Sequence, residues 1–154
     1  MLSNFIKSDQ VLFGINVKNK KSLFQELSLR CNLANKSIDQ KILFDKIIKR
    51  ERLGNTSISN GIAMPSALLD QINETFVLFS ALSKPIDYGA GDKIPVDLVC
   101  LVVSPSSSSS KHLYVLSNFS RLLKNKNISL RLRGCENSDA LFAVLLNFNL
   151  SSAA

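Results

Sequence analysis

The sequence predicts an α/β fold in which a mixed β-sheet is covered by helices on both faces. Three short runs rich in β-branched and apolar residues have the length of buried strands, at residues 11–17, 75–83 and 96–103. Stretches with apolar residues at helical spacing lie between and after them. Hydrophobic residues make up 45% and charged residues 20% of the 154 residues, which is typical of a globular protein. We expect a single domain over residues 1–154, with a frayed tail from about residue 150.

The first third of the chain predicts one strand and two helices. The strand VLFGINV at 11–17 precedes a helix over 20–33, whose apolar side chains recur at helical spacing: Leu23, Phe24, Leu27 and Cys31. Ser37 to Gln40 has the form of a capping box and opens a second helix. We expect that helix to turn a largely apolar set inward: Ile38, Ile42, Phe44, Ile47 and Ile48. It ends in the charged residues 49–52, and Gly54 supplies a stop.

The segment from residue 50 to 69, RERLGNTSISNGIAMPSALL, is the one around which the chain is organised. Gly54 and Gly61 mark places where the backbone needs unusual dihedral angles or a close approach. Residues 62–64 can enter a buried sheet edge, and Pro65 then removes a backbone donor and changes the chain direction. We therefore expect Ser66 at the rim of the sheet, facing out, at the start of a loop that continues to residue 73.

The second half alternates strands and helices. The strand at 75–83 is followed by a turn-rich connection through residues 85–92, and the strand at 96–103 has its one charge, Asp97, at its entry. Residues 104–111 form a βα loop whose last serine caps the next helix. That helix, 112–123, places one apolar set together: Leu113, Leu116, Phe119, Leu122 and Leu123. A short helix at 128–133 ends at Gly134, and Ser138 caps a last helix from 139 to about 148.

Six cations and no acid mark the stretch from Lys111 to Arg133, and the chain as a whole carries a net charge of +7 with a pI near 9.5. One interpretation is a patch for an acidic partner or a nucleic acid. The other is a solvated helix face in a lysine-rich protein. No aromatic interleaving or nucleic-acid motif accompanies the charge, which favours the solvated face and no nucleic-acid partner. Acidic protein partners are compatible with both interpretations.

Cysteine usage and hydropathy predict a cytoplasmic protein. Cys31, Cys100 and Cys135 are widely spaced, without a CxxC pair, so we expect free thiols and neither a disulfide framework nor a metal site. No apolar run approaches the roughly 20 residues that span a bilayer, so we expect no membrane insertion. The first residues lack the features of a secretory signal. No motif indicates a cofactor.

The residues suggest little catalytic chemistry by themselves. The sequence has no glycine-rich phosphate loop and no GxSxG elbow. Since His112 is the only histidine, Ser66–His112 is the only nucleophile–base pair to consider, and nothing supplies an oxyanion hole or an orienting acid. This argues against a hydrolase. A lone histidine at a helix start is typically a cap or a surface residue, and Arg50 and Arg52 suit a helix end.

Three blocks of the sequence resemble one known family. RERLGNTSISNGIAMPS resembles the active-site segment of phosphotransferase-system IIA domains of the fructose/mannitol type, above all the nitrogen-regulatory IIA proteins. KPIDYGAGDKIPVDLVCLVVSP resembles the strand pair of that family, and SKHLYVLSNFSRLLKN resembles its following helix. The resemblance covers nearly the whole chain in order. It implies the IIA fold and a cytoplasmic partner of a phosphocarrier protein of the HPr or NPr type.

The resemblance also implies roles for individual residues. The family accepts a phosphoryl group on a histidine that follows an Ile-Pro pair, and Ser66 stands at that position. A serine phosphate is a stable ester, and its hydroxyl needs a base to attack, so a reversible relay through Ser66 is chemically implausible. Arg50 matches an arginine that pairs with phosphoryl oxygens, and His112 matches a second active-site histidine. Ala67 stands where the family has glycine.

Three functional hypotheses follow from this match. In the first, the protein is a regulator that stays unphosphorylated and binds a target such as a sensor kinase or a potassium transporter. In the second, phosphotransfer persists with His112 as a displaced acceptor. In the third, the protein folds but has lost its relay. Whether the chain has enzymatic activity depends on which of these holds.

Overall fold

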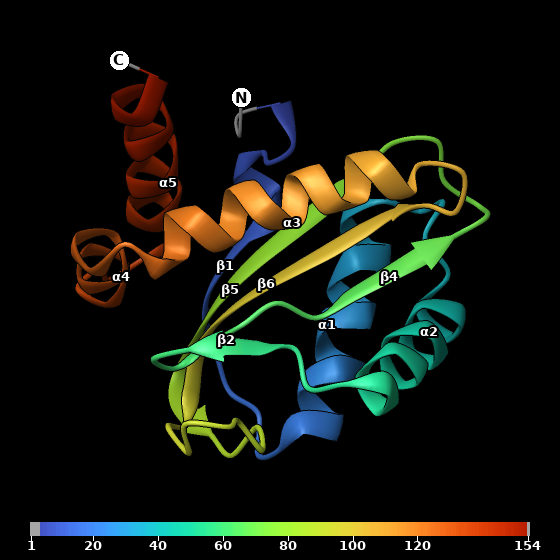
Figure 1. Cartoon of the computed structure of the whole chain (residues 1–154), viewed down its shortest axis with the longest axis horizontal. Coiled ribbons are helices and arrows are strands. Elements are labelled where there is room, and N and C mark those ends of the chain that lie inside the picture. Colours follow the sequence, from blue (N-terminus) through green and yellow to red (C-terminus); the bar gives the residue numbers. More distant parts are fainter. Residues whose placement is uncertain (1–3, 154) are drawn as a thin grey trace.

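The fold is a mixed six-stranded sheet, and the computed structural model describes residues 4–153 (Figure 1). The strand order is β1-β5-β6-β3-β2, and β4 also pairs with β6. β5 and β6 are antiparallel, whereas β1 pairs parallel with β5, and β3 and β4 pair parallel with β6. The strand bounds are β1 Val11–Ile15, β2 Ser57–Ser59, β3 Ile62–Ala63, β4 Ser66–Leu69, β5 Phe76–Ile86 and β6 Val96–Pro105.

Helices cover both faces of the sheet, as the sequence predicts. α1 (Lys20–Ala34) and α2 (Gln40–Leu53) bury one cluster of apolar side chains against it. α3 (Ser109–Lys124), α4 (Lys126–Arg133) and α5 (Ser138–Ala153) bury a second cluster on the other face, where α3 crosses the strands in Figure 1. A short 3-10 helix, η2 (Ser8–Gln10), precedes β1. β5 and β6 are almost continuously apolar because both of their faces are covered.

β3 and β4 together form one line along β6, broken only at Met64 and Pro65. Ile62 and Ala63 pair with β6, and pairing resumes at Ser66, opposite Val102. Pro65 lacks a backbone donor, but its carbonyl accepts a hydrogen bond from Val102 N at 3.1 Å, which keeps the chain in register. The predicted loop at residues 66–69 is therefore wrong. Ser66 begins a strand and is only 5% exposed, so it does not face out.

Strand ends differ from the prediction where the backbone is irregular. β1 stops at Ile15, two residues early, after a register shift at Gly14, whose φ is +72°. β5 runs on to Ile86 through a second register shift, so Pro85 lies in the strand and not in the predicted turn. β6 extends to Pro105, which shortens the predicted serine loop to three residues.

Helix caps also differ from the prediction. α2 begins at Gln40, and Asp39 caps it by accepting a hydrogen bond from Ile42 N at 2.9 Å, so the Ser37 capping box is wrong. The carboxylate directly before the helix reaches the free N–H groups of the first turn better than a hydroxyl two residues farther out. Ile42 is 37% exposed, and Leu43 is buried in its place.

The three C-terminal helices begin earlier than predicted. α3 starts at Ser109, so the predicted cap, Ser110, lies inside the helix, and Ser108 at the N-cap position makes no side-chain capping hydrogen bond. Asn137, not Ser138, caps α5 by accepting from Ala140 N at 2.8 Å. α4 starts at Lys126, two residues early, and does end at Gly134. α5 continues to Ala153 through most of the predicted frayed tail, and residue 154 lies outside the described residues.

The buried face of α3 is rotated from the predicted one. His112, Val115, Phe119, Leu122 and Leu123 face the sheet. Leu113 is 65% exposed, because a residue one position after a buried one is turned by about 100° around the helix axis. The histidine, which the sequence places at a cap or on the surface, is instead part of the packed side.

Candidate functional site

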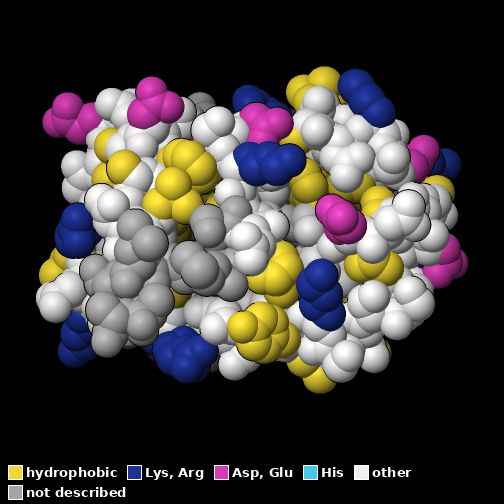
Figure 2. All heavy atoms as spheres, turned by 90° about the horizontal axis from the view of Figure 1, so that it is seen from above, with side chains coloured by type: hydrophobic (Ala, Val, Ile, Leu, Met, Phe, Trp, Pro, Cys, Tyr) yellow, Lys and Arg dark blue, Asp and Glu magenta, His cyan; other side chains and the backbone are white. Residues whose placement is uncertain are grey.

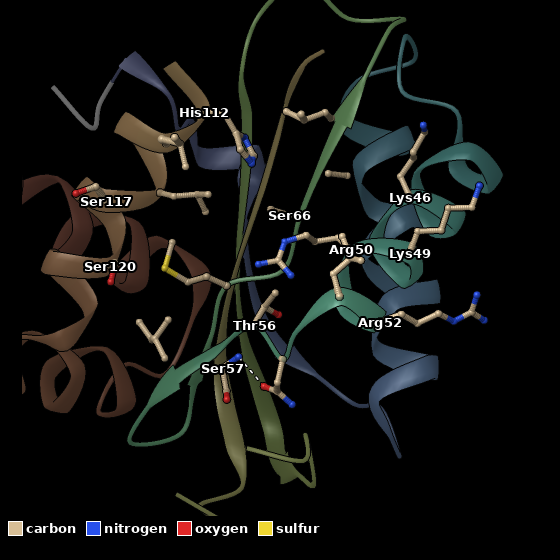
Figure 3. Close-up of a pocket in the computed structure, with 18 residues that line it drawn as sticks. Lys46, Lys49, Arg50, Arg52, Thr56, Ser57, Ser66, His112, Ser117 and Ser120 are labelled. Atoms are coloured by element: carbon tan, nitrogen blue, oxygen red, sulfur yellow. Dashed lines mark hydrogen bonds between the residues drawn. The ribbon is translucent and has the colours of Figure 1, made fainter. Parts of the chain in front are cut away.

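A cleft of about 1010 Å³ lies between α2 and α3, and residues of β2 and β4 line its floor (Figure 3). We call it the α2–α3 cleft. Arg50, Ser66 and His112, the three residues singled out from the sequence, all line it. Four cations line it, namely Lys46, Lys49, Arg50 and Arg52, and the described lining residues include no Asp or Glu. The cleft is therefore suited electrostatically to an anionic group.

Arg50 lies in the last turn of α2 and points into the cleft from the α2 side (Figure 3). Its Nη1 donates a hydrogen bond to the carbonyl of Gly54 at 3.0 Å. Arginine does close a helix end here, as the sequence suggests, but a guanidinium has five N–H donors and this bond engages one of them. The others are available to a ligand oxygen.

Gly61 confirms the predicted need for a special backbone, whereas Gly54 does not. Gly61 has a φ of +80°, and an added Cβ would lie 2.9 Å from Nη2 of Arg133 and 3.0 Å from the carbonyl of Pro95. Gly54 has an extended φ of 172°, and the nearest atom to an added Cβ is 4.0 Å away. Gly54 ends α2 without an unusual backbone conformation.

Ser66 presents its hydroxyl at the floor of the cleft. Its side chain is 95% buried by the neighbouring strands, and no described residue makes a hydrogen bond to its Oγ. Ala67 beside it is equally buried. A hydroxyl becomes nucleophilic when an adjacent base removes its proton, and the described part of the cleft has no carboxylate that could do so.

His112 enters the cleft from α3, opposite Arg50 (Figure 3). Its Nδ1 lies 2.6 Å from Oγ of Ser104, a fully buried serine of β6. This contact engages Nδ1 and leaves the other ring nitrogen, Nε2, for the cleft that His112 lines. Burial, and to a smaller extent the charge of Arg50, lower the pKa of His112 from its usual value, so the ring is neutral at pH 7.

The lowered pKa of His112 predicts that the domain loses stability in mild acid. The unfolded chain takes up the proton near pH 6.5, whereas the folded chain takes it up only at a lower pH. The neutral form of His112 therefore contributes its full stabilisation of the folded state above about pH 6.5, and this stabilisation declines as the pH falls toward the folded pKa. His112 is the only histidine. Urea unfolding between about pH 7.5 and 5.5 should show a smaller loss for His112→Gln than for wild type, and equal slopes would contradict the prediction.

A network around Glu51 holds the loop that follows α2, and the sequence did not indicate it. The Glu51 carboxylate, 8% exposed, accepts hydrogen bonds from Thr56 N at 2.8 Å and from the Thr56 hydroxyl at 2.5 Å. Tyr88 OH donates to it at 3.3 Å, and Lys20 Nζ lies 2.8 Å away. Burial first, then the Glu51 charge, raises the pKa of Tyr88. The network fixes the segment beside Arg50.

Other residues of the cleft were also missed. Lys46 and Lys49 lie on the same face of α2 as Arg50, since residues three and four apart are neighbours on a helix. Leu53, 86% exposed, and Leu113, 65% exposed, also line the cleft. Exposed apolar side chains around a charged centre are typical of a surface that binds another protein. The spacing of the lysines was the available signal, but helical periodicity does not show which cations meet.

The basic stretch from Lys111 to Arg133 does not supply the charge of the cleft. Arg133 is paired with Asp97 at 2.8 Å and donates to the carbonyl of Asn60 at 2.6 Å, and Lys111 lies over the ring of Phe5. On the face in Figure 2 the Lys and Arg side chains do not gather into one continuous patch. This supports the interpretation as a solvated face.

The cysteines and the metal-ligating side chains indicate no further functional site within the described residues. Cys31 and Cys100 are buried free thiols whose pKa burial raises, and Cys135 is half-buried. Across residues 4–153 no cluster of three or more metal-ligating side chains occurs. No helix in the described part of the chain has the length and hydrophobicity to cross a membrane.

Known proteins match the chain along almost its whole length. The family model "Phosphoenolpyruvate-dependent sugar phosphotransferase system, EIIA 2" matches residues 4–148. The chain is 31% identical over 145 residues to a nitrogen regulatory protein of Bradyrhizobium diazoefficiens, with 94% of each covered. It is 31% identical over 147 residues to the nitrogen regulatory protein of Escherichia coli, covering 94% of this chain and 88% of the relative.

Solved structures with the same fold agree with these matches. The nitrogen regulatory protein IIA-Ntr of Neisseria meningitidis superposes with a TM-score of 0.86 at 23% identity, covering 94% of this chain and 98% of the other. The mannitol IIA of Escherichia coli gives a TM-score of 0.76 at 17% identity, covering 91% and 98%. The mannitol enzyme IIA of that organism is also known in complex with phosphorylated enzyme IIB. The predicted fold class is confirmed.

Proposed function

Since the chain belongs to the phosphoenolpyruvate-dependent sugar phosphotransferase system EIIA 2 family and is homologous to the nitrogen regulatory proteins, we propose that it is a regulatory binding protein that does not itself carry a phosphoryl group. It works in the cytoplasm. A phosphocarrier protein of the HPr or NPr type docks on it, and the regulated target is a protein such as a sensor kinase or a potassium transporter.

The state of Ser66 carries this proposal. Ser66 stands at the position that the family resemblance assigns to the acceptor histidine, and no described residue hydrogen-bonds its hydroxyl. Without a base, the hydroxyl does not attack a phosphoryl donor, and a serine ester would not pass the group on. The protein therefore stays in its unphosphorylated state. Its partner surface never acquires the added charge of about −1.5 to −2 that a phosphoryl group brings.

The rest of the cleft supports a retained binding role. Arg50 and His112 still converge above Ser66, and the four cations are not offset by an acid in the described lining. Leu53 and Leu113 offer apolar contact area around this centre. A decayed protein would have no reason to keep an acid-free cationic cleft with exposed apolar side chains around it.

A phosphorelay assay tests the proposal. The protein is mixed with labelled phosphoenolpyruvate, the first enzyme of the system and its phosphocarrier. We expect no label on wild type or on Ser66→Ala, and acid-labile label on Ser66→His, because an imidazole at this position restores an acceptor beside Arg50. Acid-stable label on wild type that is lost in Ser66→Ala would contradict the proposal. Label on neither wild type nor Ser66→His would show that the carrier no longer docks.

A second candidate is phosphotransfer through His112. The observation that favours it is the placement of a neutral imidazole in the cleft with one nitrogen toward Arg50. It predicts acid-labile label on wild type that His112→Ala abolishes. The same assay therefore separates a regulator from a relay with a displaced acceptor.

A further inference from the structure

Two hydroxyl groups lie in line behind His112. Ser104 Oγ is 2.6 Å from Nδ1 of His112, and the Thr75 hydroxyl donates to Ser104 Oγ at 3.1 Å. Ser104 belongs to β6 and is fully buried, and Thr75 is the residue before β5. Neither lines the α2–α3 cleft. Their position behind the ring means that they act on the cleft only through His112.

The order of these bonds favours one position for the imidazole proton. A serine hydroxyl has one hydrogen to donate and two lone pairs that accept. Thr75 donates to Ser104 and so occupies one of its lone pairs, which leaves the Ser104 hydrogen available for donation to His112 Nδ1, 2.6 Å away. In a neutral imidazole one nitrogen carries the proton and the other accepts. When Nδ1 accepts the Ser104 hydrogen, the proton of His112 is on Nε2, and this is the tautomer that the proposal below assigns.

This tautomer decides what the cleft offers to a ligand. With the proton on Nε2, His112 presents a hydrogen-bond donor beside the Arg50 guanidinium, and together they suit the oxygens of a phosphate-like anion. With the proton on Nδ1, a lone pair would face the same oxygens and repel them. The Nε2–H form is also unable to remove a proton from Ser66, which agrees with the absence of an activated hydroxyl.

We propose that Ser104, oriented by Thr75, is a positioning residue that holds His112 as the Nε2–H tautomer and so makes the α2–α3 cleft a binding site for a phosphate-like oxyanion. This proposal rests on the proposed function in one respect, namely that partners bind at this cleft. Ser104 touches no ligand itself. Ser104 acts by determining whether His112 offers the cleft an N–H donor or a lone pair.

Nitrogen NMR on protein labelled in histidine tests the tautomer directly, because the single histidine gives one pair of ring signals. At pH 7.5 we expect the proton on Nε2 in wild type and in Ser104→Thr, which keeps the hydroxyl. Ser104→Ala should shift the population toward Nδ1–H, and Thr75→Val, which frees a lone pair of Ser104, should give a mixture. Ser117→Ala, an exposed serine lining the same cleft, is the matched control and should match wild type.

A proton on Nδ1 in wild type, or an unchanged tautomer in both Ser104→Ala and Thr75→Val, would overturn the positioning role. Far-UV circular dichroism on each variant confirms that the fold is kept, and Thr75→Val serves if Ser104→Ala does not fold. A purely structural role of Ser104 would change stability and leave the tautomer as it is.

Titration with inorganic phosphate tests the second half of the proposal on the same samples. His112 signals should move on phosphate addition, and the dissociation constant should rise about five-fold in Ser104→Ala, the equivalent of one hydrogen bond, and return in Ser104→Thr. No response of wild type, or equal affinities of wild type and Ser104→Ala, would overturn it. The phosphate titration contains no phosphocarrier or other relay component. Label on wild type in the phosphorelay assay would therefore refute the proposed function without changing the outcome of the titration.

Discussion

Replacing Val99 by aspartate should unfold the protein. Val99 lies in β6, the strand that pairs with β5 on one side and with β3 and β4 on the other. It is opposite Ser80 and Ala63, is 0% exposed, and belongs to the apolar cluster that α1 and α2 cover. A carboxylate there would be buried without a partner.

The expected cost is large compared with the stability of a domain. Burying an unpaired charge costs several kcal/mol even after relaxation, whereas a whole domain is stable by about 5–15 kcal/mol. Val99→Asp should therefore be insoluble or show no cooperative urea transition, and Val99→Ala, which only removes methyl groups, should lose about 2 kcal/mol and still fold.

Leu113→Asp is the matched control for Val99→Asp. It introduces the same charge at an apolar residue that is 65% exposed, in the first turns of α3, where an acid is electrostatically favourable. The midpoint of its urea unfolding should be close to that of wild type. A soluble Val99→Asp protein with a cooperative transition at the wild-type midpoint would contradict the burial of β6.

Replacing Glu51 by alanine should have the second largest effect, about 3 kcal/mol of stability. The change removes the acceptor for Thr56 N, the Thr56 hydroxyl and Tyr88 OH, and the counter-charge of Lys20. Thr56 and Tyr88 are buried, and their hydroxyls, 2.7 Å apart, would keep only each other, whereas Thr56 N would lose a partner that water could replace only by opening the loop.

Equilibrium urea unfolding measures this effect, and Glu26→Ala is its control. Glu26 forms an exposed pair with Arg30 at 3.8 Å, a kind of contact that contributes little, so its removal should change stability by less than about 0.5 kcal/mol. Equal effects of Glu51→Ala and Glu26→Ala would mean that the buried network does not hold the loop. Glu51→Ala should also weaken phosphate binding, because the same loop carries the carbonyl of Gly54 that Arg50 binds.

The local sequence pattern correctly predicted those strands and helices whose apolar spacing does not depend on residues far away in the chain. The apolar runs that became β5 and β6 and the helical spacing that became α1 are examples, because a strand buried on both faces must be apolar throughout and a packed helix must repeat its apolar residues. Gly61 was also predictable, since a positive φ with close neighbours tolerates only glycine well. Family resemblance, more than any local pattern, brought Arg50, Ser66 and His112 into one site.

Errors arose where a competing partner lay nearby or across the sheet. Ser66 was predicted in a loop because Pro65 breaks strands, yet the Pro65 carbonyl still bonds to Val102 and pairing resumes. His112 was predicted at the surface because a lone histidine at a helix start has no local reason to be buried. Its reason is Ser104, a residue of β6 whose hydroxyl satisfies the ring nitrogen inside the protein.

By itself the sequence determined an α/β protein of the IIA type, with apolar strands, amphipathic helices and Ser66 at the position of an acceptor. Only the tertiary structure decided which side of α3 is buried, that four cations meet in a cleft without an acid in its described lining, and that Thr75 and Ser104 lie in line behind His112. The physical reason is that periodicity specifies which residues share a face, whereas the partner of a buried polar atom depends on how helices and strands far apart in the chain pack together.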